Sequence, residues 1–240
     1  MNAPAASRTW PFPGVVWGDY PEQAPHSKAR APRRALSRRA LERFADAAAA
    51  AAPLSASDLS ARLQSLQELA PDADDWLLEA FHVGGSALAI ALGFAPHRQQ
   101  LLAARVLLDD RLVEMATGEG KTAAIALAAA VAALARTPVH VITANDYLAQ
   151  RDADQLRPFF ALLGLRTGCV TQPMPASARR LAYACDITYC TAKEVVFDYL
   201  RDGMARTADL SSLEQRARRL ETSPSGEAAR SPAGSGRAAN

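Results

Sequence analysis

The sequence lacks an apolar stretch of the length that a membrane-spanning helix needs, which is about 20 residues. Its most apolar run, residues 123–135, is shorter and consists mainly of alanine. The first residues of the chain include Arg8 and several prolines, but not the apolar core of a secretory signal peptide. We therefore expect no spanning helix and no cleaved leader, and a protein that is soluble or at most peripheral to a membrane.

Cysteine is scarce, and neither sign of charge is in excess. Cys169, Cys185 and Cys190 show no C-x-x-C spacing, which argues against a zinc ribbon or a disulfide framework and favours a reducing, cytosolic setting. The 27 Lys and Arg residues nearly balance the 25 Asp and Glu residues, leaving a net charge of +2. A net charge this small does not identify a polyanionic partner.

The two ends of the chain have the composition of tails. Residues 1–35 are rich in Pro, Ala and Arg and predict an arm, whereas residues 222–240 contain no large apolar side chain and predict a disordered tail. A basic run extends from Lys28 to Arg43. It indicates either a solvated face or a contact with anionic lipid or nucleic acid.

Residues 36–93 have a helical pattern, in which Leu59, Leu63 and Leu66 recur at three- and four-residue steps. Ser55 and Ser57 are candidate helix caps in this segment. We predict a further helix over residues 72–92, weakened or bent at Gly84 and Gly85 and ended by Gly93.

From residue 94 helical segments alternate with short β-branched runs. The predicted strands cover residues 112–116, 139–143, 166–170 and 186–191. The predicted helices cover residues 97–108, 121–135, 145–163, 176–184 and 193–201. This alternation predicts an α/β fold over residues 94–221, with a parallel sheet covered by helices on both faces.

The strongest motif is the segment Thr117-Gly118-Glu119-Gly120-Lys121-Thr122, between a predicted strand and a predicted helix. Gly118 and Gly120 let successive backbone N–H groups point at phosphate oxygens, and the helix N-terminus adds its dipole. Lys121 would contact the β- and γ-phosphates, and the Thr122 hydroxyl would bind Mg²⁺. The motif predicts binding of ATP or a close nucleotide, and the alternative is a glycine-rich turn before an ordinary helix.

Gln99 and Gln100 lie on the predicted helix before this loop. A glutamine amide can both donate to and accept from the edge of adenine. The alternative is a pair of glutamines on a solvated helix face.

Further segments resemble one known family. They are Glu79-Ala80-Phe81, Gln100-Leu101-Leu102, Asn145-Asp146-Tyr147-Leu148-Ala149-Gln150-Arg151-Asp152-Ala153 and Phe197-Asp198-Tyr199-Leu200-Arg201-Asp202. At this spacing around Glu114–Thr122, the sequence resembles SecA, the preprotein translocase motor, whose ATPase core is related to DEAD-type helicases.

The resemblance implies a helical N-terminal segment followed by an incomplete RecA-like, P-loop parallel sheet. It implies that Gln100 contacts adenine and that Thr117, Gly118, Glu119, Gly120, Lys121 and Thr122 hold ATP and Mg²⁺. Asn145–Asp152 and Thr191–Asp202 match the family's coupling motifs. The partners implied are preproteins, the membrane translocation channel and anionic lipid, at the cytoplasmic face of the plasma membrane, and nucleic acid is not expected.

The sequence also departs from the family. Arg98 stands where members often have Asp, Cys190 where they have Gly, and Ala192-Lys193 where they have Asn-Asn. After Met204 there is no Asp-Glu-x-Asp segment, whose carboxylates organise Mg²⁺ and the attacking water in the family. We therefore expect the first part of a motor that binds nucleotide weakly and hydrolyses it negligibly, with no catalytic residue of its own. The alternatives are part of a helicase-type nucleic-acid ATPase, or a truncated product that acts as a decoy or has no function.

Overall fold

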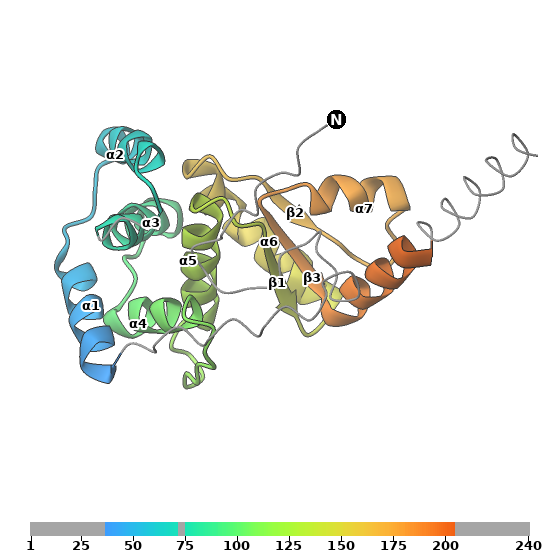
Figure 1. Cartoon of the computed structure of the whole chain (residues 1–240), viewed down its shortest axis with the longest axis horizontal. Helices are drawn as coiled ribbons and strands as arrows, with labels where there is room; N and C mark the ends of the chain where they lie inside the picture. Colours follow the sequence, from blue (N-terminus) through green and yellow to red (C-terminus); the bar gives the residue numbers. More distant parts are fainter. Residues whose placement is uncertain (1–36, 72–74, 205–240) are drawn as a thin grey trace, which may run out of the picture. The chain divides into compact units, whose positions relative to one another are not determined.

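A computed structural model describes residues 37–71 and 75–204. The predicted arm, residues 1–35, and the predicted tail, residues 222–240, lie outside these residues. The chain divides into two compact units after Glu194. The helices and strands of the first unit are α1 (Arg38–Ala50), α2 (Ala56–Glu68), α3 (Trp76–Leu92), α4 (Arg98–Leu107), α5 (Lys121–Leu134), β1 (Val139–Thr143), α6 (Asp146–Leu162), β2 (Thr167–Cys169), α7 (Ala176–Tyr183) and β3 (Ile187–Thr191) (Figure 1).

Ser55 and Gly93 lie at helix ends, as predicted. The Ser55 hydroxyl accepts a hydrogen bond from the Asp58 N–H and begins α2, whereas Ser57 lies inside that helix. Gly93 ends α3 with a left-handed φ of 79°, and its N–H donates to the Ala89 carbonyl. Such a C-cap favours glycine because it has no Cβ.

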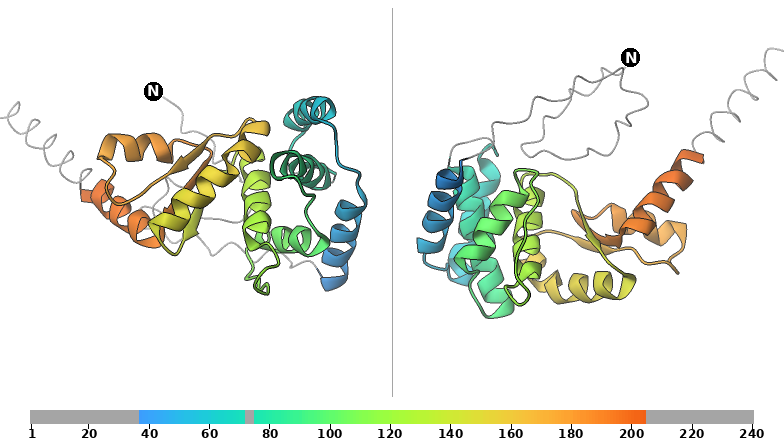
Figure 2. Two further views of the ribbon diagram at one scale, coloured as in Figure 1. Left: turned by 180° about the vertical axis from the view of Figure 1, so that it is seen from behind. Right: turned by 90° about the horizontal axis from the view of Figure 1, so that it is seen from below.

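Helix α5 is buried over most of its length and packs against α3, α4 and β1 (Figures 1 and 2). Its alanines therefore belong to the core. Helix α3 continues through Gly84 and Gly85 as one helix, and a Cβ at Gly84 would lie 2.7 Å from Cδ1 of Leu127 in α5. Gly84 thus allows two helices to approach closely.

The sheet is parallel, and its strand order is β1-β3-β2. Neighbouring residues of a strand point to opposite faces. Tyr189 of β3 meets Phe160 of α6, with ring centroids 6.4 Å apart, and the adjacent Thr188 donates its hydroxyl hydrogen to the Ala182 carbonyl of α7 at 2.9 Å. Helices α6 and α7 therefore cover opposite faces (Figure 1). The predicted α/β class is confirmed, with β1 at its predicted bounds.

The predicted strand over residues 112–116 is wrong. These residues have no regular secondary structure, and Leu112 is 99% exposed. A strand forms only where a neighbouring strand supplies hydrogen-bond partners. In the described part of the chain, the three strands pair only with one another.

The predicted division between residues 36–93 and 94–221 stays a prediction. Helix α3 of the first segment packs on α5 and α6 of the second. Residues 192–204 are helical, and the part from Val195 belongs to the second unit. None of the helices in residues 37–71 and 75–204 is both long and apolar enough to cross a bilayer.

Candidate functional site

The predicted phosphate loop is a tight turn that leads into α5. Gly118 and Gly120 have φ values of +90° and +77°, a region that L side chains seldom adopt. A Cβ at Gly118 would meet no atom within 4 Å, so the space beside the loop is open. The N-cap of α5 is Gly120, and no side chain caps this helix. The N–H groups of its first two residues, Lys121 and Thr122, are therefore available to an anion, whereas the Ala123 N–H donates to the Gly120 carbonyl at 3.0 Å.

Two charged side chains of the loop form hydrogen bonds with the backbone of Ala116. The Lys121 Nζ donates to the Ala116 carbonyl at 2.9 Å, and the Ala116 N–H donates to Oε2 of Glu119 at 3.0 Å. Both charged groups are solvent-exposed. The ammonium group is therefore held over the loop by a single carbonyl oxygen, a weaker partner than an anionic phosphate.

Gln100 lies beneath the loop and is only 4% exposed. Its Oε1 accepts the His97 N–H at 2.9 Å, and its Nε2 donates to the Glu119 carbonyl at 2.9 Å. Both ends of its amide thus bond within the chain. The structure brings Gln100 and the loop together, and the predicted contact between Gln100 and adenine stays a prediction.

Arg98, one of the departures from the family pattern, is directed toward α1. Its guanidinium donates to Asp46, and this hydrogen bond holds the pKa of the Asp46 carboxyl below its usual value. Arg98 therefore ties α4 to α1.

The donor set of the loop suits a nucleotide that brings its own magnesium. Within the described residues, no three His, Cys, Asp or Glu side chains lie close enough to form a metal site. Mg²⁺ bound with a nucleotide takes most of its ligands from phosphates and water and one or two from the protein. Thr122, half-buried in the first turn of α5, is of the right type for such a single ligand.

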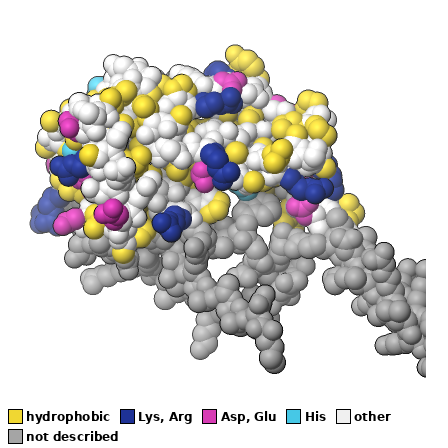
Figure 3. Space-filling model, turned by 90° about the horizontal axis from the view of Figure 1, so that it is seen from above, with side chains coloured by type: hydrophobic (Ala, Val, Ile, Leu, Met, Phe, Trp, Pro, Cys, Tyr) yellow, Lys and Arg dark blue, Asp and Glu magenta, His cyan; other side chains and the backbone are white. Residues whose placement is uncertain are grey.

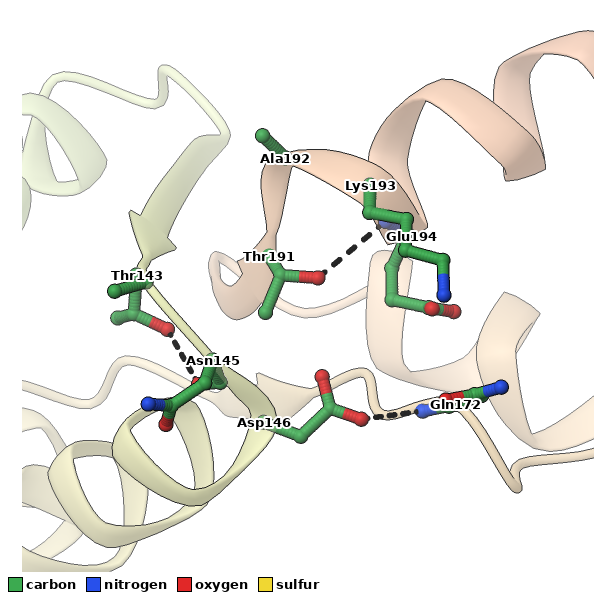
Figure 4. Close-up of a pocket in the computed structure, with 9 residues that line it drawn as sticks. Thr143, Asn145, Asp146, Gln172, Thr191, Ala192, Lys193 and Glu194 are labelled. Carbon is green, nitrogen blue, oxygen red and sulfur yellow. Dashed lines mark hydrogen bonds between the residues drawn. The ribbon is translucent and has the colours of Figure 1, made fainter.

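A hollow lies at the carboxyl ends of β1 and β3, with a volume of about 440 Å³ (Figure 4). Asn145 caps α6, because its Oδ1 accepts the Leu148 N–H at 2.8 Å, and Asp146 accepts the Gln172 N–H at 2.9 Å. On the opposite wall Thr191 accepts the Glu194 N–H at 3.4 Å. The hollow joins the two segments predicted as coupling motifs, and Ala192 and Lys193 also line it.

A buried ion pair, which the sequence reasoning missed, supports this hollow. Arg179 of α7 lies 2.6 Å from Oε2 of Glu194, and both side chains are 6% exposed. Arg179 also donates to three backbone carbonyls, those of Thr171, Gln172 and Met174. The only signal in the sequence was the place of Glu194 just after a parallel strand, where functional residues gather.

The described atoms of one face of the molecule carry positive and negative side chains interspersed among polar and apolar ones (Figure 3). Lys28, Arg30, Arg33 and Arg34 of the basic run lie outside the described residues, whereas Arg38 forms an exposed ion pair with Glu42 at 2.8 Å. The alternative interpretations of that run stay open.

The sequence matches the SecA DEAD-like domain family over residues 24–220. It is 40% identical over 170 residues to the protein translocase subunit SecA 2 of Nitrosospira multiformis, covering 70% of this chain and 26% of that protein. It is 50% identical over 131 residues to SecA of Clostridium novyi, covering 55% of this chain and 16% of that protein. The match to SecA of Methylococcus capsulatus is 48% identical over 136 residues, which are 57% of this chain and 15% of that protein.

Proposed function

Because the chain belongs to the SecA DEAD-like domain family, we propose that residues 117–122 bind ATP together with Mg²⁺. The observation that carries this proposal is the loop itself. Two glycines with positive φ, an uncapped helix N-terminus and an exposed ammonium group occur together in six residues. Backbone amides and a lysine are the groups with which proteins hold a triphosphate.

Backbone and side-chain groups of the loop would contact different parts of the Mg²⁺-ATP complex. The N–H groups of Gly118, Gly120 and Lys121 would donate hydrogen bonds to phosphate oxygens, and the Lys121 ammonium would exchange the Ala116 carbonyl for a phosphate oxygen. Thr122 would hold Mg²⁺, which supplies charge neutralisation between the phosphates when it is bound. Thr117 and Glu119 complete the turn.

The wider role that we propose is that of a nucleotide-binding part of a protein-translocating motor. The three relatives described above are named protein translocase subunits. The matching part of this chain covers 15 to 26% of the length of each of them. The partners would be preproteins, the membrane channel and anionic lipid, at the cytoplasmic face of the plasma membrane. The hollow between Asn145 and Lys193 is the part of this chain that we assign to coupling, since both of its walls carry family motifs.

Titration with a fluorescent ATP analogue and Mg²⁺ tests the binding. We expect saturable association, and Lys121→Ala should weaken it at least tenfold, because charge-assisted hydrogen bonds to a phosphate are lost. Lys28→Ala, which removes a lysine far from the loop in sequence, serves as the matched control. Association that does not saturate, or that is unaffected by Lys121→Ala, would overturn the proposal.

A further inference from the structure

The backbone N–H and the side chain of Glu119 both form hydrogen bonds with one residue, Ala116, across the first turn of the phosphate loop. We infer that these two hydrogen bonds, called the clasp below, lower the affinity of the loop for a triphosphate, so that Glu119 sets how tightly the chain binds ATP. This inference rests on the proposed binding of ATP by residues 117–122 and adds a residue that opposes it.

The clasp consists of two hydrogen bonds that run in opposite directions. The Glu119 N–H donates to the Ala116 carbonyl at 3.4 Å, and the Ala116 N–H donates to Oε2 of Glu119 at 3.0 Å. The first of these bonds makes residues 116–119 a β-turn, in which Gly118 is the third residue. Its φ of +90° is of the sign that a type II turn requires at that position. The carboxylate of Glu119 thus closes a second time a turn that the backbone already closes.

The clasp occupies a backbone donor of the phosphate loop. A backbone N–H carries a single hydrogen, so the Glu119 N–H cannot point at a phosphate oxygen while it donates to Ala116. A loop of this kind binds an anion through successive N–H groups that converge on it. The clasp therefore removes one N–H group from the run between Gly118 and Lys121.

The clasp also places a negative charge beside the lysine of the loop. The Lys121 Nζ donates to the same Ala116 carbonyl at 2.9 Å, so the ammonium and the Glu119 carboxylate bind the two polar backbone groups of one residue. Opposite charges this close partly cancel in the field that reaches a ligand. A triphosphate is repelled by the carboxylate and attracted less strongly by the partly neutralised ammonium.

Stability of the fold does not require the carboxylate of Glu119. Glu119 and Ala116 are both exposed, so water can replace the carboxylate as the partner of the Ala116 N–H, and such an exchange changes the stability little. The positive φ of Gly118 and the backbone hydrogen bond define the turn without it. Substitution of Glu119 should therefore leave the chain folded and change how it binds a ligand.

The experiment measures the Kd of Mg²⁺-ATP on the 240-residue chain by isothermal titration calorimetry, at low salt and in about 1 M NaCl. Glu119→Gln removes the charge but keeps an acceptor for the Ala116 N–H. We expect it to bind about threefold more tightly at low salt, and no more tightly than the unmodified chain at high salt, because salt screens exposed charges.

Glu119→Ala removes both the charge and the acceptor. We expect about tenfold tighter binding at low salt, and part of this gain should persist at high salt, because the loss of a hydrogen bond is not screened. Tighter binding is a result that damage to the fold cannot produce. The two substitutions together therefore separate the repulsion by the carboxylate from the closure of the turn.

Glu68→Gln is the matched control, because it makes the same chemical change and the same change in net charge at an exposed residue that ends α2. It should leave the Kd unchanged at both salt concentrations. If Glu68→Gln tightens binding as much as Glu119→Gln does, the gain comes from net charge alone and the inference is wrong.

The remaining outcomes separate this inference from the proposed function. If neither the unmodified chain nor the two Glu119 variants bind Mg²⁺-ATP, the proposed function fails. If the unmodified chain binds and both Glu119 variants bind equally well or more weakly, the clasp does not oppose binding, and the proposed function stands without it. Circular dichroism of each variant verifies that it is folded, and Glu119→Gln, which keeps the acceptor, still tests the inference if Glu119→Ala unfolds.

Discussion

Arg179 and Glu194 form an ion pair that is almost completely withdrawn from water, with both side chains 6% exposed. Removing one partner of a buried pair leaves the other charge without compensation, which typically costs about 3–5 kcal/mol. Because Arg179 also donates to three carbonyls, we expect Glu194→Gln to lower the free energy of unfolding by about 3 kcal/mol, the lower end of that range. Urea unfolding, monitored by circular dichroism, measures this change in the free energy of unfolding.

The matched control is Glu42→Gln, which makes the same chemical change in an exposed pair. The side chains of Arg38 and Glu42 are 92% and 39% exposed, and such pairs contribute about 0.5 kcal/mol or less. Equal effects of the two substitutions would show that the Glu194 carboxylate is not the buried partner described here.

At the residue scale, the sequence predicted the phosphate loop but not the long-range contacts of buried side chains beside the loop and beside the hollow. Gly118, Gly120 and Lys121 are recognisable because they are neighbours in a motif whose chemistry depends on local geometry. The contact of Gln100 with Glu119 and that of Arg179 with Glu194 join residues 19 and 15 positions apart. Such pairings depend on how helices pack against the sheet, and no local pattern specifies that.

At the scale of elements, hydrophobic periodicity and caps predicted most of the helix bounds. The wrongly predicted strand at residues 112–116 has one cause. An amphipathic helix such as α2 satisfies its own backbone, so its sequence predicts it well. A strand depends on a partner. Val139–Thr143 has its partner in β3, whereas residues 112–116 have none among the described strands.

The contact between β2 and α7 gives a prediction at this scale. A Cβ at Gly168 in β2 would lie 2.4 Å from the carbonyl oxygen and 2.9 Å from Cα of Ala182 in α7. Backbone atoms cannot turn aside as a side chain can, so Gly168→Ala must push α7 from the sheet. We expect a loss of about 1–3 kcal/mol in unfolding free energy, as overpacking typically causes, measured by thermal unfolding.

Gly203→Ala is the control for Gly168→Ala, because a Cβ there meets no atom within 4 Å. That variant should keep or slightly raise stability, since alanine favours a helix over glycine. A Gly168→Ala variant as stable as the Gly203→Ala variant would mean that β2 and α7 are not in the close contact described.

For the whole molecule, we expect ATP to bind without being hydrolysed. Hydrolysis needs an oriented water and charge stabilisation at the transferred phosphoryl group. The loop supplies backbone amides, the Lys121 ammonium, the Glu119 carboxylate and the hydroxyls of Thr117 and Thr122. Among residues 37–71 and 75–204, no three acidic, histidine or cysteine side chains lie close enough to hold a metal ion.

We therefore expect Mg²⁺-ATP to stabilise the chain without being consumed. A ligand at 100 times its Kd adds about 2.7 kcal/mol to the free energy of unfolding, which raises the Tm of a chain of this size by about 5–11 °C. Differential scanning fluorimetry should show the same shift with a non-hydrolysable ATP analogue. With Lys121→Ala at the same concentration it should show about half that shift or less, because a tenfold weaker site is stabilised by only about 1.4 kcal/mol. A phosphate-release assay run beside it should give the rate of a protein-free blank, because hydrolysis needs an oriented water in addition to the groups that hold the phosphates. Turnover above the blank that disappears in Lys121→Ala would show that the chain itself completes the hydrolytic site.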